Sequence, residues 1–171
     1  DTVDYSGSAN GVVVDLGAGS AQDQGAGTSI GTDTMISIEN IIGSDFDDTL
    51  TGSSVANQIT GGGGDDTLSG LGGDDTYVFG DNAGTDSVVE AAGGGTDTLD
   101  FSSVSVDLDF AIASVTVTAI GINITHTGTQ IENLIGGSAD DTFSFADGAG
   151  LTGTIDGRGG SDHLDFSAFT R

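Results

Sequence analysis

A period of nine residues governs the stretch from Gly43 to Val78. Read in nines, this stretch is GSDFDDTLT, GSSVANQIT, GGGGDDTLS and GLGGDDTYV, in unbroken register. Each unit begins with glycine, has Asp or Asn at its sixth place and has a large apolar residue at its eighth. A short fixed period predicts a stacked, repetitive architecture in which each unit contacts its neighbours along the chain.

The chemistry of the nine places predicts a turn followed by a strand. Glycine lets the backbone adopt positive φ and approach other groups closely, because it has no Cβ. The last three residues read as a short strand whose side chains point alternately out, in and out. Only the eighth side chain then faces inward, which explains why it alone is bulky and apolar. Two units make one coil of eighteen residues.

Stacked turns bring side-chain oxygens together. Coils of eighteen residues place Asp48 over Asp66 along one edge and Asn57 over Asp75 along the other. Calcium takes six to eight oxygen ligands at about 2.3–2.6 Å, and two successive turns can supply carboxylates and backbone carbonyls. We therefore expect several Ca²⁺ ions, with a weaker site at the neutral Asn57. The glycines expected to line these turns are Gly43, Gly61, Gly63, Gly64, Gly70, Gly72 and Gly73.

The charge of the chain supports a bound cation. The formal net charge is −25, and the only Lys or Arg residues are Arg158 and Arg171. Such a charge excludes nucleic acid as a direct partner, since phosphate binding needs Lys and Arg. It also argues against anionic membrane surfaces, and no apolar run is long enough for direct membrane insertion. Without cations, self-repulsion should leave the chain largely disordered, so that folding and metal binding become one event.

Further ligand positions and a longer repeat lie outside the regular block. The sixth-place pattern continues less regularly at Asp86, Asp97, Asp141 and Asp162. The openings DTVDYS, DTLDFS and DHLDFS begin at Asp1, Asp97 and Asp162, and an IEN motif occurs at residues 38–40 and again at 131–133. We predict one continuous solenoid of three superrepeats, at residues 1–96, 97–161 and 162–171, with the nonapeptide block at 43–78. The last superrepeat is truncated, so we expect the chain to be a segment of a longer repetitive protein.

The predicted fold class is all-β. No stretch of ten or more residues shows helical periodicity, and glycine is spread throughout. Residues 12–35 and 104–128, between each opening and its IEN motif, read as alternating strands separated by polar or glycine turns. We expect the whole chain to coil in one direction around a thin apolar interior.

These repeats resemble the RTX (haemolysin-type calcium-binding) family of secreted bacterial proteins, most specifically in the nonapeptides. The IEN and GGTDTLDFS phrases look like the spacer units of very large RTX surface proteins and adhesins. The resemblance implies a right-handed parallel β-roll with Ca²⁺ in the turns, type I secretion and folding outside the cell. It assigns the ligand role to Asp48, Asp66, Asp75, Asp86, Asp97, Asp141 and Asp162.

We expect a calcium-binding structural segment of a secreted or cell-surface bacterial protein, acting as a spacer in an adhesin, surface layer or extracellular filament. The alternative is a non-catalytic carrier module of a type I-secreted enzyme, such as a protease, lipase or polysaccharide-modifying enzyme. We expect no catalysis by the chain itself, because four near-identical Asp-Asp pairs do not define one unique active site. Calcium is the expected partner, with self-association through open solenoid ends or binding to cell-surface components as further hypotheses.

Overall fold

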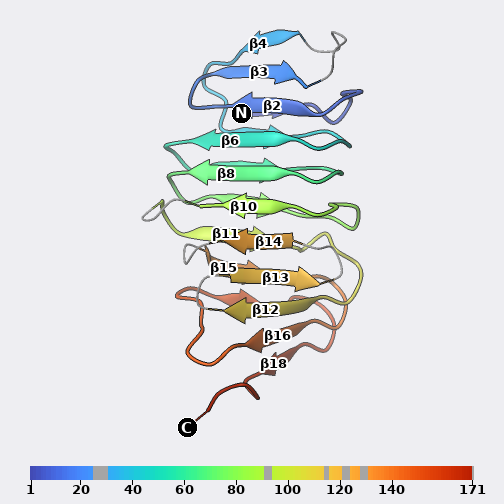
Figure 1. Ribbon diagram of the computed structural model, residues 1–171, viewed down its shortest axis with the longest axis vertical. Coiled ribbons are helices and arrows are strands. Elements are labelled where there is room, and N and C mark those ends of the chain that lie inside the picture. The colour runs from blue at the N-terminus through green and yellow to red at the C-terminus, as the bar shows by residue number, and fades with distance from the viewer. Residues whose placement is uncertain (25–30, 91–93, 114–115, 121–123, 128–130, 171) are drawn as a thin grey trace.

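A computed structural model describes residues 1–24, 31–90, 94–113, 116–120, 124–127 and 131–170. The regular structure in these residues consists of β-strands, with no helix, as predicted. The molecule is elongated, with the strands running across its long axis and stacked along it (Figure 1). The N-terminus lies beside β2 toward one end, and the C-terminus lies at the other end.

The described strands form two sheets. Sheet A has seven strands in the spatial order β1 (Thr2–Asp4), β5 (Asn40–Ile42), β7 (Gln58–Thr60), β9 (Thr76–Val78), β11 (Asp97–Asp100), β15 (Ile131–Ile135) and β17 (Ile155–Asp156). Sheet B has eleven, in the order β18 (His163–Asp165), β16 (Thr142–Phe145), β12 (Asp109–Ala113), β13 (Thr116–Ile120), β14 (Ile124–Thr127), β10 (Ser87–Val89), β8 (Thr67–Leu71), β6 (Thr49–Ser53), β2 (Val12–Asp15), β3 (Ser20–Asp23) and β4 (Thr32–Thr34). In the nonapeptide block the chain alternates between the sheets, which makes a parallel β-roll.

The register confirms the coil of eighteen residues. In sheet B, Leu50 pairs with Leu68 across β6 and β8. In sheet A, Ile59 pairs with Tyr77 across β7 and β9. All four are eighth-place residues and are fully buried. A repeat of nine therefore sends alternate units to opposite sheets and brings their apolar side chains into one interior.

Beyond the regular block, an aromatic stack fills the interior. The rings of Phe79, Phe101, Phe110 and Phe143 follow one another with centroid separations of 4.9, 5.1 and 4.8 Å. All four are at most 2% exposed. The stack lies where the coils grow longer: Tyr77 pairs with Leu99, 22 residues on, rather than eighteen. Large rings fill the extra width that smaller aliphatic side chains would leave empty.

Two segments depart from coiling in one direction. β2, β3 and β4 pair antiparallel, and so do β12, β13 and β14. The expected alternating strands are present, but they fold back within sheet B instead of crossing to sheet A. A strand that is joined to the next by a short turn pairs antiparallel with it, whereas a parallel partner needs a crossover.

The superrepeat is visible in the strand pairing. β1 pairs with β5 as β11 pairs with β15, and β2 pairs with β6 as β12 pairs with β16. The third opening motif differs, because its strand β18 lies in sheet B whereas β1 and β11 lie in sheet A. The domain boundaries at residues 96 and 161 remain a prediction.

The interior column makes a testable prediction about stability. Leu68 is fully buried between Leu50 and Val88. We expect Leu68→Ala to lower the free energy of unfolding at saturating Ca²⁺ by about 2–5 kcal/mol, because it removes buried methyl groups and leaves a cavity. Denaturant titration measures this. The exposed Val55→Ala serves as control, and an equal loss in both variants would contradict the packing argument.

Candidate metal sites in the turns

The sixth-place aspartates form a hydrogen-bonded column along one edge of the roll. The Asp66 Oδ1 accepts the backbone N–H of Asp48 at 2.8 Å, and the Asp86 Oδ1 accepts that of Asp66 at 2.9 Å. At the start of this column, the Asp48 Oδ1 accepts the N–H of Val12 at 2.7 Å. Each carboxylate therefore bonds its coil to the preceding one. The expected stacking of Asp48 over Asp66 is confirmed.

A second column runs along the opposite edge. The Asp75 Oδ1 accepts the N–H of Asn57 at 2.7 Å, and the Asp97 Oδ1 accepts that of Asp75 at 2.9 Å. The Asn57 side chain is fully engaged, because its Oδ1 accepts the N–H of Ser53 at 2.6 Å and its Nδ2 donates to the carbonyl of Glu39 at 2.6 Å. Asn57 is therefore held by hydrogen bonds within the protein, and the weaker ion site expected there stays a prediction.

The same arrangement recurs near the C-terminal end of the roll. The Asp141 Oδ1 accepts the N–H of Leu108 at 3.0 Å, and the Asp162 Oδ1 accepts the N–H of Asp141 at 3.0 Å. Asp141 is buried, whereas Asp162 is exposed. The predicted ligand positions are therefore joined in columns, although Asp141 and Asp162 lie apart from the regular block.

The first aspartate of each Asp-Asp pair bonds in the other direction. These fifth-place residues are exposed, and they accept N–H groups from the following coil. The Asp47 Oδ1 accepts the N–H of Asp65 at 2.9 Å, and the Asp65 Oδ1 accepts that of Thr85 at 3.0 Å. Each pair thus joins its coil to both neighbouring coils, which gives both aspartates of the dipeptide a structural role.

First-place glycines make room for the carboxylates. A Cβ on Gly61 would lie 2.1 Å from the Asp66 Oδ2, and one on Gly70 would lie 2.0 Å from the Asp75 Oδ2. Gly43 has the same relation to the Asp48 Oδ2, at 2.3 Å. The sixth-place carboxylate therefore folds back over the first residue of its own unit. Any side chain at the first place would occupy the carboxylate's position.

The other predicted glycines shape the turn. Gly64 and Gly73, at the fourth place, have φ of 108° and 102°, values that side chains strongly disfavour. Gly63 and Gly72, at the third place, donate their N–H groups to the carbonyls of Ser44 and Ser53 in the preceding coil. Six of the seven predicted glycines lie in these turns, and Gly70 lies within β8 next to its last residue.

Among the residues that the structure describes, three carboxylate oxygens have no hydrogen-bond partner although they are fully buried. They are the Oδ2 atoms of Asp66, Asp75 and Asp97. Burial raises the pKa of Asp66 to about 8, of Asp86 to about 7 and of Asp75 to about 6. Loss of water is the main cause in each case, and neighbouring carboxylates add to it. An ionised carboxylate in this setting is unfavourable unless a cation compensates it.

The chain supplies almost no cations of its own. Arg158 is exposed and is the only Lys or Arg among the described residues. Hard divalent cations prefer carboxylate and carbonyl oxygens, which are the groups that these turns present. The donor set and the unpartnered buried oxygens therefore fit Ca²⁺, with Asp66, Asp75 and Asp97 offering the free oxygens.

Comparison with protein families agrees with this geometry. Residues 42–77 match the model for the RTX calcium-binding nonapeptide repeat, in four copies. This chain carries RTX calcium-binding repeats. The match spans about a fifth of the sequence and agrees within one residue at each end with the nonapeptide block. A comparison with curated proteins found no match.

Two glutamates join the columns that the RTX repeats begin, and the motif did not predict either. The Glu132 Oε2 accepts the N–H of Asp97 at 2.8 Å and thereby takes the place of a sixth-position Asp. The carboxylate of Glu90 lies beside those of Asp75 and Asp97. The repeated IEN motif was a signal for Glu132, because Glu39 of the first IEN bonds the N-terminal amino group of Asp1 in the same way. Glu90 had no such signal.

The described residues contain no helix of the length and apolarity needed to cross a membrane.

The close fit at the first place of the RTX unit predicts a steric effect. We expect Gly61→Ala to destabilise the Ca²⁺-loaded roll by about 1–3 kcal/mol, since the new Cβ overlaps the Asp66 carboxylate. Calcium titration followed by circular dichroism should show a higher midpoint. Gly80→Ala is the matched control, because a Cβ there meets nothing within 4 Å. Equal midpoints for the two variants would contradict the expected overlap.

The raised pKa values predict a pH dependence for the ion-free RTX roll. The pKa values of Asp66, Asp75 and Asp86 are higher in the folded state than in the unfolded chain, where Asp titrates near 3.9. Their contribution to stability is therefore fully present below about pH 4 and is lost as the pH rises through about 6 to 8. In chelator, we expect more β signal at pH 5 than at pH 8. At saturating Ca²⁺ the trend should reverse, because protons compete with the ion.

Two variants distinguish the effect of a buried carboxylate on the pH dependence from the effect of the overall negative charge. In chelator, Asp66→Asn should reduce the pH dependence of the β signal. Asp45→Asn, at an exposed position, should leave that dependence unchanged. A chelated protein with more β structure at pH 8 than at pH 5 would show that the buried carboxylates do not control folding.

Proposed function

We propose that this chain is a calcium-stapled β-roll that serves as a stiff spacer in a secreted or surface-attached bacterial protein. The observation that carries this proposal is the set of buried, unpartnered oxygens on Asp66, Asp75 and Asp97. In a chain of net charge −25, these oxygens make the folded state dependent on a cation. Stiffness would then follow from calcium, since the ion joins adjacent coils.

An extracellular location is consistent with this dependence. RTX repeats are typical of secreted bacterial proteins. Extracellular calcium-binding modules commonly have dissociation constants of about 10⁻⁴–10⁻³ M, so that they fill outside the cell and stay empty in the cytosol. A chain that folds only after calcium binds would remain extended during export, which suits type I secretion.

The spacer role is supported by the repetition of one structural unit along the roll. The pairing of β1 with β5 and of β2 with β6 recurs for β11 with β15 and β12 with β16. Repetition of this kind adds length to the roll. We propose that the segment has no catalytic activity of its own, because its Asp-Asp pairs are used in bonds between coils. The alternative, a carrier module of a secreted enzyme, uses the same calcium-dependent folding.

The test is a Ca²⁺ titration after chelation, followed by far-UV circular dichroism and small-angle X-ray scattering. We expect a cooperative change from disordered to β signal, with a change from an expanded coil to a rod. Mg²⁺ should not substitute, because it demands a tighter octahedral geometry and gives up its water reluctantly. A β spectrum and rod shape that persist in chelator would refute the proposal.

A further inference from the structure

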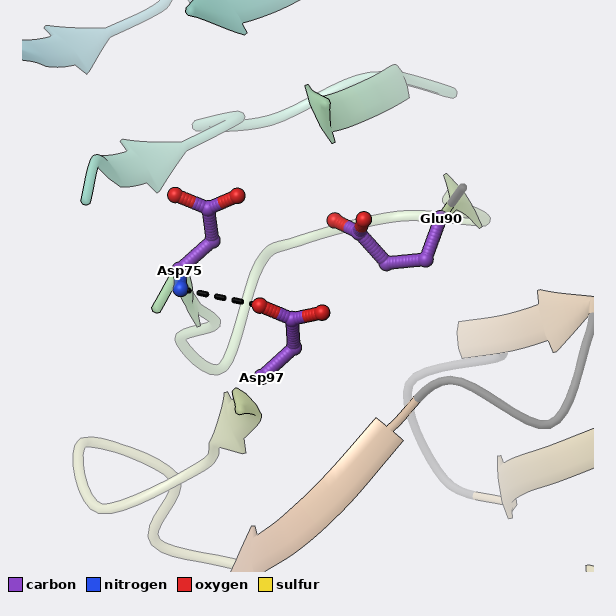
Figure 2. A group of neighbouring side chains, drawn as sticks. All are labelled: Asp75, Glu90 and Asp97. Carbon is purple, nitrogen blue, oxygen red and sulfur yellow. Dashed lines mark hydrogen bonds between the residues drawn. The ribbon is translucent and has the colours of Figure 1, made fainter. Parts of the chain in front are cut away.

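A group of three carboxylates lies where the regular RTX block ends. Asp75 precedes β9, Asp97 begins β11, and Glu90 follows β10. Figure 2 shows their side chains pointing toward one common space. One oxygen from each lies within 4.8 Å of the others, and all three residues are at most 8% exposed. Only Asp75 and Asp97 belong to the sixth-place pattern.

Glu90 stands in a column that glycine otherwise occupies. The register of β8 and β10 pairs Ser87 with Thr67 and Val88 with Leu68, which aligns Glu90 with Gly70. Gly70 is a first-place residue that the Asp75 carboxylate overlies, so a side chain there would clash. From Glu90 to Asp97 the turn is two residues longer than from Gly70 to Asp75. At this place the chain has an acidic side chain instead of glycine.

Neighbouring groups hold the Glu90 carboxylate in place. The hydroxyl of Tyr77 donates a hydrogen bond to its Oε1, and the N–H of Gly70 donates to the same atom at 3.3 Å. Tyr77 is fully buried by the surrounding core. Glu90 is therefore fixed beside the two aspartates, so its proximity to them is imposed by packing and hydrogen bonds.

The two aspartates supply an independent sign of a ligand. The Oδ2 atoms of Asp75 and Asp97 are buried and have no hydrogen-bond partner, although each Oδ1 accepts a backbone N–H. Both residues are only 1% exposed. Arg158 is the only Lys or Arg among the described residues, and it is exposed and lies outside this group.

We propose that Asp75, Glu90 and Asp97 form a three-carboxylate Ca²⁺ site that binds more tightly than the sites of the regular nonapeptides. This inference rests on the proposed calcium-dependent folding and adds Glu90 as a ligand outside the nine-residue motif. Calcium affinity rises with the number of charged ligands and with the rigidity of the site, and this site has three charges in a fixed frame. This site binds Ca²⁺ before the others and fixes the geometry where the regular coils meet the wider ones.

Tyr77 provides a built-in probe of this site. The chain has two tyrosines, Tyr5 and Tyr77, and no tryptophan. Tb³⁺ replaces Ca²⁺ at oxygen sites and emits when a nearby tyrosine is excited. Titration of the full chain with Tb³⁺ should therefore give tyrosine-sensitised emission that saturates at about one ion per chain. Ca²⁺ should displace this ion.

Substitutions test which tyrosine sensitises the Tb³⁺ emission and whether Glu90 contributes to the tightest Ca²⁺-binding step. Glu90→Gln keeps the side-chain shape and should weaken the tightest Ca²⁺-binding step about tenfold or more in isothermal titration calorimetry. Glu39→Gln is the control on a half-buried glutamate that bonds the amino group of Asp1 and lies outside the three-carboxylate group, and it should leave that step unchanged. Equal affinities in Glu90→Gln and wild type would overturn the site. Tyr77→Phe should abolish the sensitised emission and Tyr5→Phe should preserve it, and the reverse result would also overturn the site.

The outcomes distinguish this inference from the proposed function. Should Glu90→Gln not fold at saturating Ca²⁺ by circular dichroism, Glu90→Asp takes its place in the calorimetry, because it keeps the charge but shortens the side chain, and an unchanged tightest step would refute the Glu90 site. If wild type gains β structure with Ca²⁺ but Glu90→Gln keeps the tightest step, only the Glu90 site is refuted. If wild type gains no β structure with Ca²⁺, the proposed function is refuted as well.

Discussion

The structure depends on a carboxylate that is only half satisfied by the protein. At each regular turn the sixth-place Asp uses one oxygen to accept an N–H from the preceding coil, as Asp66 does for Asp48. Its other oxygen is buried and, at Asp66, Asp75 and Asp97, has no partner. Burying charge in this way is unfavourable without a cation. The proposed dependence of folding on calcium rests on this one feature of the carboxylates.

The hydrogen bonds between coils act in two directions along the roll. Sixth-place aspartates bond the preceding coil, and fifth-place aspartates such as Asp47 and Asp65 bond the following one. Each coil therefore has polar connections to both neighbours in addition to the shared apolar interior. In a stacked architecture, stability is approximately a sum of unit and interface terms. Here the polar interface terms and the candidate metal ligands involve the same Asp-Asp dipeptide, so that ion binding at these turns would be coupled to coil stacking.

The sequence predicted the regular block well because a strict period fixes register, face and ligand position together. Leu50 over Leu68 and Asp48 over Asp66 follow directly from counting by nine. The antiparallel strands after β2 and β12 were not predicted, since alternation of apolar residues indicates a strand but not the direction of its partner. Glu90 was missed for a related reason. Its contact with Asp75 and Asp97 depends on a turn lengthened by two residues, and a fixed motif cannot describe the path of an insertion.

The change of sheet at the third opening motif has a geometric consequence. The strands of the first two copies, β1 and β11, lie on one face of the roll, whereas β18 lies on the other. A half-turn is one passage of the chain from one sheet to the other. A copy of the motif returns to the same face when an even number of half-turns separates it from the previous copy, and it lies on the opposite face when that number is odd. Units that differ in length by one half-turn therefore point the same motif to opposite sides of the rod. Variation in repeat length looks like irregularity in the sequence. In the solenoid it determines on which side of the rod each copy of the motif lies.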